Sequence, residues 1–192
     1  MNEFGFALFD TAIGRCGIVW NQNGVVGVQL PERSESATRQ RVLRRFAAAR
    51  EAEPSAHAQH AIAGIVALIG GERRDLNDVT LDLSAAPEFN RRVYAVARSI
   101  GPGATLSYGE VAERLGDRQF ARDVAQALSE NPCPIVVPCH RVLAAGGKTG
   151  GFSAPGGVAT KLKLLSIEGA QPEGPMLFEG LPLKTAPRRR RA

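Results

Sequence analysis

A cysteine followed directly by a histidine is the pair of residues in this sequence best suited to chemistry. Cys139 and His140 lie between the apolar run Pro134–Val137 and the turn residues Ala145–Lys148. A thiol becomes a nucleophile when a neighbouring base or positive charge favours its thiolate form. The pair therefore indicates a nucleophilic cysteine, and the alternative is a structural cysteine buried beside a loop histidine.

The residues before this pair predict the element that positions it. The run Pro134–Val137 is too short for a helix and is rich in β-branched residues, so we expect a buried strand. Pro138 fixes its own φ and favours extended geometry at Val137. We therefore expect the thiol at the end of a rigid strand.

Two short helices are predicted upstream of the pair. Ser107 is the expected N-cap of a helix that ends near Leu115, and a second helix is expected at about 118–130. Two helices around a glycine-containing turn are typical of a helix-turn-helix, and a plain helical hairpin in an enzyme core is the alternative. The side of the second helix expected to pack inward consists of Ala121, Val124 and Leu128. The opposite side carries one cation among small or polar residues: Arg122, Ala125, Gln126 and Ser129.

The residues before Pro87 predict a scaffold that carries no catalytic constellation. Turn signals separate three β-prone runs that indicate an antiparallel meander, namely Phe4–Thr11, Cys16–Trp20 and Val25–Leu30. Two helices are expected next, the first capped by Ser34 or Ser36 and the second ending at Ile69. A further strand is expected at Val79–Leu83.

His57 and His60 stand one turn apart on the second of these helices. A pair of histidines at this spacing can contribute to a metal site. We expect exposed polar residues here instead, because no cysteine or third histidine lies near them in the sequence.

Composition places the chain among ordinary globular proteins. Its 192 residues allow one or two domains with a real core, and 44% of them are hydrophobic and 22% charged. The start of the sequence lacks the features of a signal peptide, and no apolar run approaches membrane-spanning length. Three cysteines without a disulfide pattern suit a reducing compartment. We therefore expect a cytoplasmic protein that does not enter a membrane.

The net charge of +5 is concentrated near the end of the sequence. The segment from Gln171 onward carries five basic and two acidic residues, so the rest of the chain has only a small positive charge. The run Arg188–Arg191 is expected to lie in a solvated tail that adds salt-dependent affinity for DNA of any sequence. The overall charge alone therefore does not identify a nucleic-acid-binding protein.

Several motifs of the second half occur in the order and spacing of a known family. They are Ser107-Tyr108-Gly109, Ala121–Val124, Asn131-Pro132, Pro134–Val142 and Lys161–Leu165 followed by Ile167-Glu168-Gly169. From about Pro87 to Gly169, the chain resembles the O6-alkylguanine-DNA alkyltransferases, also called methylated-DNA–protein-cysteine methyltransferases. The resemblance implies an α/β (α+β) fold with a ribonuclease-H-like sheet-and-helix domain at 1–85. It further implies a winged helix-turn-helix-like alkyltransferase domain at 86–170, followed by the basic tail at 171–192.

The resemblance implies DNA repair by direct, stoichiometric transfer of an alkyl group to the protein itself. The alkyl group would come from O6-alkylguanine, or from O4-alkylthymine, and Cys139 would accept it. His140 would deprotonate the thiol through a bound water, and Glu168 would orient His140. Asn131 would stiffen the turn that holds the site. Because the thioether has no route back to a thiol, each molecule would react once.

The resemblance also implies how DNA is held. The alkylated base must be rotated out of the duplex, and Arg122 would occupy the vacated place. Tyr108 would bind guanine N3 and stabilise the leaving guanine. The expected pocket residues are Tyr108, Pro134, Val142, Phe152 and Ser153. The expected DNA contacts are Ser107, Tyr108, Arg122, Ala125, Gln126, Ser129 and Arg141.

The expected partner is double-stranded DNA that contains O6-alkylguanine. We expect no metal and no other cofactor, and the residues of the zinc site that some family members carry in the N-terminal domain are absent from the sequence. We expect the protein to act as a monomer.

The sequence departs from the family pattern at the pocket and on the second predicted helix. The loop Gly150–Gly157 is about two residues longer than usual, so it either stands back to admit bulky adducts or is a harmless insertion. One edge of the helix is expected to carry two carboxylates, and its residues are Asp123, Gln126, Ala127 and Glu130. Asp123 would either repel a DNA phosphate or stabilise the start of its own helix.

Two other functions remain as alternatives. A non-catalytic alkylation sensor would use the same DNA surface. Such a protein would lack the cysteine that accepts the alkyl group, whereas Cys139 is present here. A thiol hydrolase or acyltransferase would use the Cys139-His140 pair with turnover and an oxyanion hole. A helix that approaches a DNA groove would have no purpose in such an enzyme.

Overall fold

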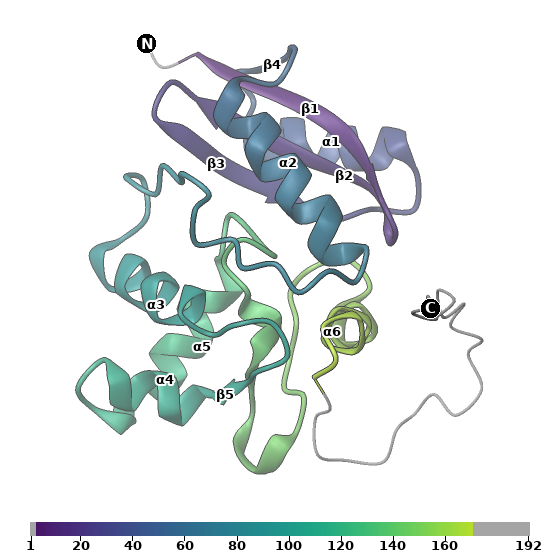
Figure 1. Cartoon of the computed structure of the whole chain (residues 1–192). Coiled ribbons are helices and arrows are strands. Elements are labelled where there is room, and N and C mark those ends of the chain that lie inside the picture. The colour runs from purple at the N-terminus through teal and green to yellow at the C-terminus, as the bar shows by residue number, and fades with distance from the viewer. Residues whose placement is uncertain (1–2, 171–192) are drawn as a thin grey trace, which may run out of the picture.

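The computed structural model describes residues 3–170, so the basic tail expected at 171–192 lies outside the described residues. The described chain begins with a four-stranded sheet and continues into a mainly helical second half (Figure 1). This mixed architecture confirms the α/β fold class expected from the sequence. No described helix is both long enough and apolar enough to cross a membrane.

The sheet consists of a meander and one added edge strand. Strands β1 (Phe4–Thr11), β2 (Gly14–Asn21) and β3 (Gly24–Gln29) pair antiparallel, as predicted. Strand β4 (Ala49–Glu51) pairs parallel to β1 and gives the order β3-β2-β1-β4. The sequence did not predict β4, because three residues are too few to show an alternating pattern.

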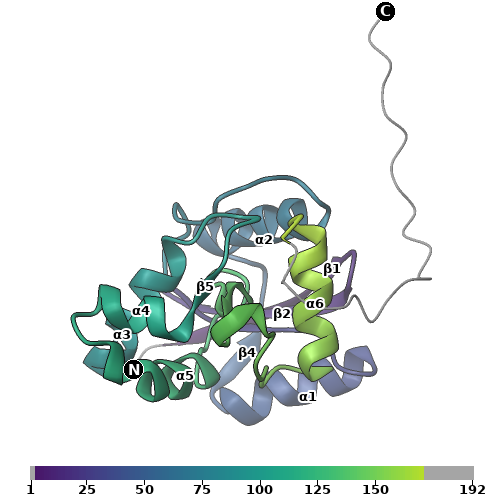
Figure 2. The ribbon, with the colours of Figure 1, turned by 90° about the horizontal axis from the view of Figure 1, so that it is seen from below.

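Helices cover both faces of this sheet (Figures 1 and 2). Helix α1 (Glu35–Arg45) begins at Ser34, whose side chain accepts a hydrogen bond from the Ala37 N–H and so confirms the predicted cap. Its Val42 packs in a small core on one face of the sheet. Helix α2 (Ala56–Ile69) packs on the opposite face in the main core.

The expected strand at Val79–Leu83 is wrong. Leu81 forms only an isolated bridge with Val25, and no strand continues from it. The carboxylate of Asp82 instead accepts a hydrogen bond from the Asn21 side chain at 2.7 Å. The segment is therefore a loop tethered to the start of the edge strand β3 and to Asn21.

The second half contains the predicted pair of short helices. Its elements are α3 (Glu88–Arg98), β5 (Leu106–Ser107), α4 (Tyr108–Arg114), α5 (Ala121–Ser129), β6 (Val142–Leu143) and α6 (Gly157–Ile167). Ser107 caps α4 as predicted: its Oγ accepts from the Glu110 N–H, and its own N–H donates to the Glu110 carboxylate. A single turn of 3₁₀ helix at Arg118–Phe120 leads into α5, so the second helix also lies where it was expected.

One continuous hydrophobic core joins the two halves of the chain. It runs from Trp20 on the sheet and Ile65 on α2 to Val137 and Leu164 in the second half. The buried Tyr94 hydroxyl on α3 donates to the backbone oxygen of Ala127 on α5 at 2.9 Å. The elements that carry the Cys139 segment therefore rest on a shared rigid core.

Candidate functional site

A tight turn, and not a strand, delivers Cys139. The Asn131 side chain donates to the Val137 oxygen at 2.8 Å and accepts from the Cys133 N–H at 2.9 Å. The Val137 N–H also donates to the Cys133 oxygen, and Ile135 has a φ of 77°, which is rare for a β-branched residue. The expected strand at Pro134–Val137 is therefore wrong, although the run is buried as expected. We call residues 131–138 the Asn131 turn.

Cys139 begins a 3₁₀ turn directly after the Asn131 turn. It is 9% exposed and lines a cavity of about 250 Å³. Burial raises the pKa of the Cys139 thiol, while the Asn131 side chain and the Lys161 ammonium oppose this rise. The thiol thus faces a cavity and has groups nearby that favour its thiolate form.

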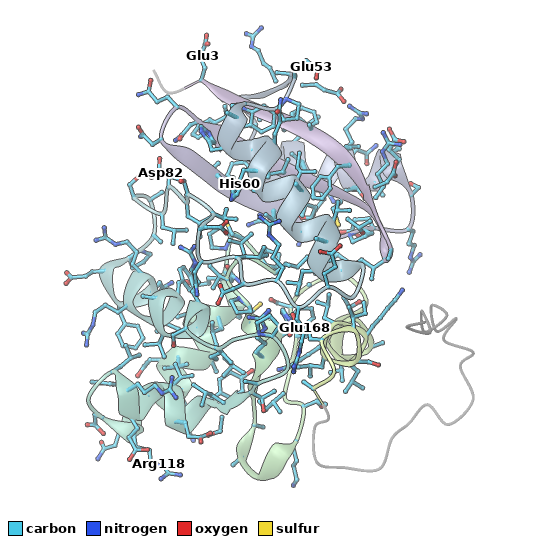
Figure 3. All side chains as sticks on the ribbon, viewed as in Figure 1. Glu3, Glu53, His60, Asp82, Arg118 and Glu168 are labelled. Atoms are coloured by element: carbon cyan, nitrogen blue, oxygen red, sulfur yellow. The ribbon has the colours of Figure 1, made fainter. Side chains whose placement is uncertain are left out.

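His140, the residue after Cys139, forms a buried pair with Glu168, which is labelled in Figure 3. The His140 Nε2 atom lies 2.9 Å from Oε1 of Glu168, while the buried Nδ1 atom of His140 has no hydrogen-bond partner. Burial lowers the pKa of His140 despite the nearby carboxylate, so the ring is neutral near pH 7. Since Nε2 faces a carboxylate, we assign the proton to Nε2, which leaves the lone pair on Nδ1.

Arg141 is the third buried residue of this group and binds the carboxylate of Glu168. Its guanidinium donates to both oxygens of Glu168 at 2.8 Å and to the Ile100 oxygen at 2.5 Å, and the residue is 4% exposed. The expected DNA contact by Arg141 is therefore wrong. Burial opposes the charged form of Glu168, but the hydrogen bonds from His140 and Arg141 outweigh it and hold its pKa at about 2.

Lys161 is a site residue whose role the sequence motifs do not reveal. It is fully buried on α6, and its Nζ atom donates to the Val142 oxygen at 2.6 Å and to the Gly151 oxygen at 3.5 Å. Its ammonium lies 5.8 Å from the ring centre of Tyr108. Burial lowers the pKa of Lys161 to about 8, and the charge interaction with Cys139 counteracts part of that effect. Lys161 thus supplies a cation to the interior of the site.

The cavity beside Cys139 contains only some of the expected pocket residues. Pro134, Phe152 and Ser153 line it as expected. Val142 does not line it, because its side chain is buried in the core, and Tyr108 does not line it either. Tyr108 is half-buried next to Gly150, and burial raises the pKa of its hydroxyl, with a smaller contribution from Cys139.

The loop Gly150–Gly157 reaches the cavity with more than the two expected residues. Ala154 and Pro155 also line the cavity. The Ser153 hydroxyl donates to the Ser129 oxygen at 3.0 Å and so ties the loop to the end of α5. The longer loop therefore forms part of the cavity wall.

The exposed side of α5 carries the residues that were expected to approach DNA. Arg122, Gln126 and Ser129 are exposed, and Ala125 is half-buried between them. Asp123 is exposed in the first turn, but Ala127 is buried and does not belong to the edge where it was expected. The side predicted to pack inward is confirmed by the burial of Val124 and Leu128, and Ala121 is half-buried.

The two N-terminal histidines are engaged within the protein. His60 is exposed and lies 2.8 Å from the Asp78 carboxylate, whereas His57 is half-buried against the Asn21 oxygen. Within residues 3–170, no three His, Cys, Asp or Glu side chains gather as metal ligands would.

Comparison with known proteins gives these features a family context. Residues 88–170 match a family model described as the 6-O-methylguanine DNA methyltransferase DNA-binding domain. The methylated-DNA–protein-cysteine methyltransferase of Methanothermobacter thermautotrophicus is 35% identical over 158 residues, which cover 82% of this chain and 81% of that protein. The protein of the same name from Mycolicibacterium paratuberculosis is 45% identical over 112 residues, which cover 56% of this chain and 66% of that protein.

A solved structure extends the similarity to both halves of the chain. The crystal structure of Mycobacterium tuberculosis OGT in complex with DNA has a TM-score of 0.69 and 30% sequence identity. The match covers 86% of this chain and 92% of that chain. The fold and the sequence motifs therefore point to the same group of proteins.

Proposed function

This chain belongs to the methylated-DNA–protein-cysteine methyltransferase family, and we propose that it repairs DNA by moving the alkyl group of O6-alkylguanine onto its own Cys139. One observation carries the proposal. Cys139 lines a cavity, and the adjacent His140 is held by Glu168 with its other ring nitrogen unpartnered. This is the arrangement of a nucleophile, a base and an orienting group.

The proposed reaction begins with removal of the thiol proton. His140 takes this proton on Nδ1 through a water, and the carboxylate of Glu168 stabilises the imidazolium that results. The buried ammonium of Lys161 favours the thiolate of Cys139. Burial alone would disfavour that thiolate, so the base His140 and the ammonium of Lys161 offset part of the free-energy cost of forming it.

The thiolate then attacks the carbon attached to guanine O6. The new S–C bond forms as the C–O bond breaks, and the electron pair of that bond stays on the guanine. Tyr108 does not line the cavity, but it lies next to Gly150 at the start of the loop that forms part of the cavity wall. We propose that its hydroxyl donates a hydrogen bond to guanine N3 and so spreads the negative charge of the leaving base. The thioether on Cys139 cannot return to a thiol without another reactant, so each molecule reacts once.

The proposed function also requires DNA to bind at α4 and α5. A base inside a duplex cannot reach a buried thiol, so it must leave the stack. The exposed Arg122 on α5 is the residue that we propose to fill the vacated space. The relative from Mycobacterium tuberculosis has been crystallised in complex with DNA, which supports DNA as the partner here.

A turnover experiment tests this function. The protein is mixed with a tenfold excess of O6-methylguanine duplex, and the loss of the lesion is followed without any added cofactor. The proposal expects the loss to stop at one lesion per protein molecule. Continued turnover would identify a hydrolase, and no loss at all would contradict alkyl transfer.

A further inference from the structure

The cavity beside Cys139 has a wall that comes from the N-terminal half of the chain. Gln29 at the end of β3 and Leu30 after it line the cavity, together with Arg41 and Arg45 on α1. The opposite wall comes from the end of α5, the Asn131 turn and the loop Gly150–Gly157. The site is therefore built between the sheet region and the helical region, and its N-terminal wall carries two arginines.

Arg45 connects these two walls of the cavity. Its guanidinium donates to the Val28 oxygen at 3.5 Å and to the Pro132 oxygen at 3.4 Å, so it bridges β3 and the Asn131 turn. It also lies 5.5 Å from the ring centre of Phe46. Burial lowers the pKa of Arg45, with a smaller contribution from the charge of Arg41. Arg45 therefore has a structural role.

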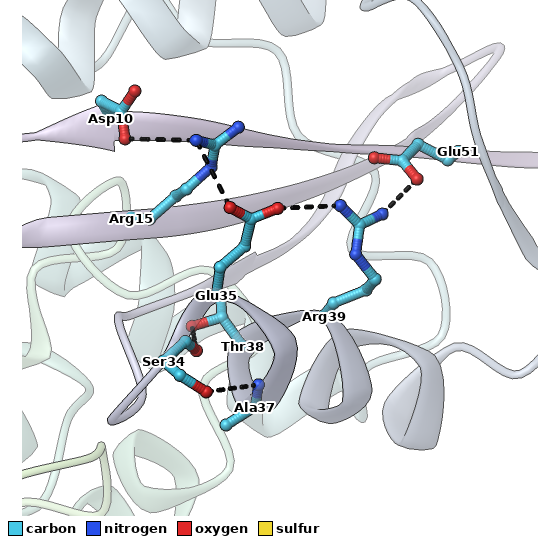
Figure 4. Close-up of polar contacts among 8 residues, drawn as sticks. All are labelled: Asp10, Arg15, Ser34, Glu35, Ala37, Thr38, Arg39 and Glu51. Carbon is cyan, nitrogen blue, oxygen red and sulfur yellow. Dashed lines mark hydrogen bonds and ion pairs between the residues drawn. The ribbon is translucent and has the colours of Figure 1, made fainter.

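Arg41 lies one helical turn before Arg45 and is exposed. Among the described residues, no hydrogen bond and no ion pair engages its side chain. Arg39 on the same helix differs, because it pairs with Glu35 and Glu51 (Figure 4). Arg41 is thus a free cation at the rim of the cavity that contains Cys139.

One carboxylate also lines this cavity, and its oxygens are already occupied. Glu130 accepts a hydrogen bond from the Gln126 amide at 2.6 Å and another from the Asn90 amide at 3.0 Å. Within residues 3–170, it forms no ion pair with Arg41 or Arg45. The charge of Arg41 therefore remains available to a ligand of opposite charge.

We infer that Arg41 binds a phosphate of the DNA strand that carries the alkylated nucleotide, and this inference rests on the proposed function. A base that enters the cavity stays covalently linked to a phosphate on each side, so these phosphates must lie at the rim. A guanidinium binds a phosphate with two parallel hydrogen bonds and fixes its position. The N-terminal half thus helps to position the extruded nucleotide over Cys139.

The variant Arg41→Gln tests this inference, with Arg44→Gln as the matched control. Arg44 is exposed on the same helix and does not line the cavity. The rate of alkyl transfer is measured with O6-methylguanine duplex and with free O6-benzylguanine, which has no phosphate. We expect Arg41→Gln to slow duplex repair about fivefold to tenfold and to leave the free base unaffected, while Arg44→Gln changes the duplex rate less than twofold.

Binding provides a second measurement. The affinity for the same duplex is measured at several salt concentrations in a Cys139→Ala background, so that the lesion stays intact. Loss of one phosphate contact should reduce the slope of log K against log salt by about one for Arg41→Gln. Arg41→Lys should recover part of the affinity, because it keeps the charge.

Three outcomes would overturn the inference. Equal losses on duplex and free base would make Arg41 a structural residue. Equal effects of Arg41→Gln and Arg44→Gln would indicate general attraction by the helix, and an unchanged salt slope would show that no phosphate contact was lost. Failure of the wild-type protein to transfer the alkyl group at all would instead contradict the proposed function.

Discussion

The Nε2 atom of His140 lies 2.9 Å from Oε1 of Glu168, and both side chains are almost completely buried. This contact holds the imidazole in one orientation and leaves its Nδ1 atom as the free nitrogen. Arg141 binds the same carboxylate from the other side. Glu168, at the end of α6, therefore determines which ring nitrogen of His140, the residue next to Cys139, carries the proton.

Glu168→Gln should destabilise the protein strongly at pH 7. The change leaves Arg141 charged and buried without its partner, which typically costs about 3–5 kcal/mol. Chemical unfolding measures this loss. The control Asp78→Asn removes the carboxylate of the exposed pair with His60 and should have little effect. Equal losses for the two variants would contradict a special role for the buried pair.

The same variant should change how stability depends on pH. The pKa of Glu168 is about 2 in the folded protein and near 4.5 when unfolded, so its contribution is complete above pH 4.5 and is lost as pH falls towards 2. His140 also makes the folded protein less stable as pH falls. Because its pKa is lower in the folded protein, the unfolded state binds a proton first below about pH 6.5. Wild-type protein should therefore lose more stability than Glu168→Gln between pH 4.5 and 2. Parallel curves would refute this assignment.

Lys161→Met should move the reaction to higher pH. Without the buried ammonium, the pKa of Cys139 rises further, so the rate of alkyl transfer should fall at pH 7 and recover as pH increases. Lys163→Met is the control, since Lys163 is exposed on the same helix. A uniform loss of rate at every pH would mean that Lys161 acts only through its contacts with the Val142 and Gly151 oxygens.

Arg122→Ala should slow repair of duplex DNA far more than reaction with free O6-benzylguanine. Only the duplex requires an extruded base, and unstacking costs a few kcal/mol, so we expect a loss of about tenfold or more. The exposed Arg91 on α3 provides the control variant Arg91→Ala, which should leave both rates nearly unchanged. Equal losses on both substrates would make Arg122 a residue that supports the fold.

Asp123→Asn should tighten binding to duplex DNA, most clearly at low salt. Asp123 is exposed in the first turn of α5, beside Arg122. A carboxylate near a phosphate in solvent costs about 1 kcal/mol, which corresponds to about a fivefold change in affinity, and added salt screens it. The alternative is that Asp123 stabilises the helix N-terminus. Unchanged affinity at all salt concentrations, or a lower Tm without tighter binding, would support that alternative.

The sequence predicted local features well and long-range contacts poorly. Strands β1 to β3 and the cap at Ser107 depend on neighbouring residues, so pattern and spacing were sufficient. The pattern of Pro134–Val137 predicts a strand, because nothing local reveals that Asn131 bridges Val137 and Cys133 into a turn. Its β-branched composition reflects burial and not an extended backbone.

Charged residues of the site were the most difficult to assign. Arg141 looked like a surface cation because its partner Glu168 is 27 residues away in the sequence. Lys161 did give a signal, since it precedes Leu164 and Leu165 by helical spacing and so shares their inward face. No sequence pattern placed Arg41 at the cavity, because α1 and Cys139 meet only in the folded protein.

Mapping the modified residue tests the central claim most directly. Burial raises the pKa of Cys16 to about 11 and that of Cys133 to about 12, and neither residue lines the Cys139 cavity. After reaction with O6-methylguanine duplex, intact-protein and peptide mass spectrometry should find one methyl group per molecule, on Cys139 alone. Cys139→Ala should bind the same duplex and gain no methyl group. A methyl group on Cys16, Cys133 or any other residue, or a repaired duplex beside unmodified protein, would contradict the account.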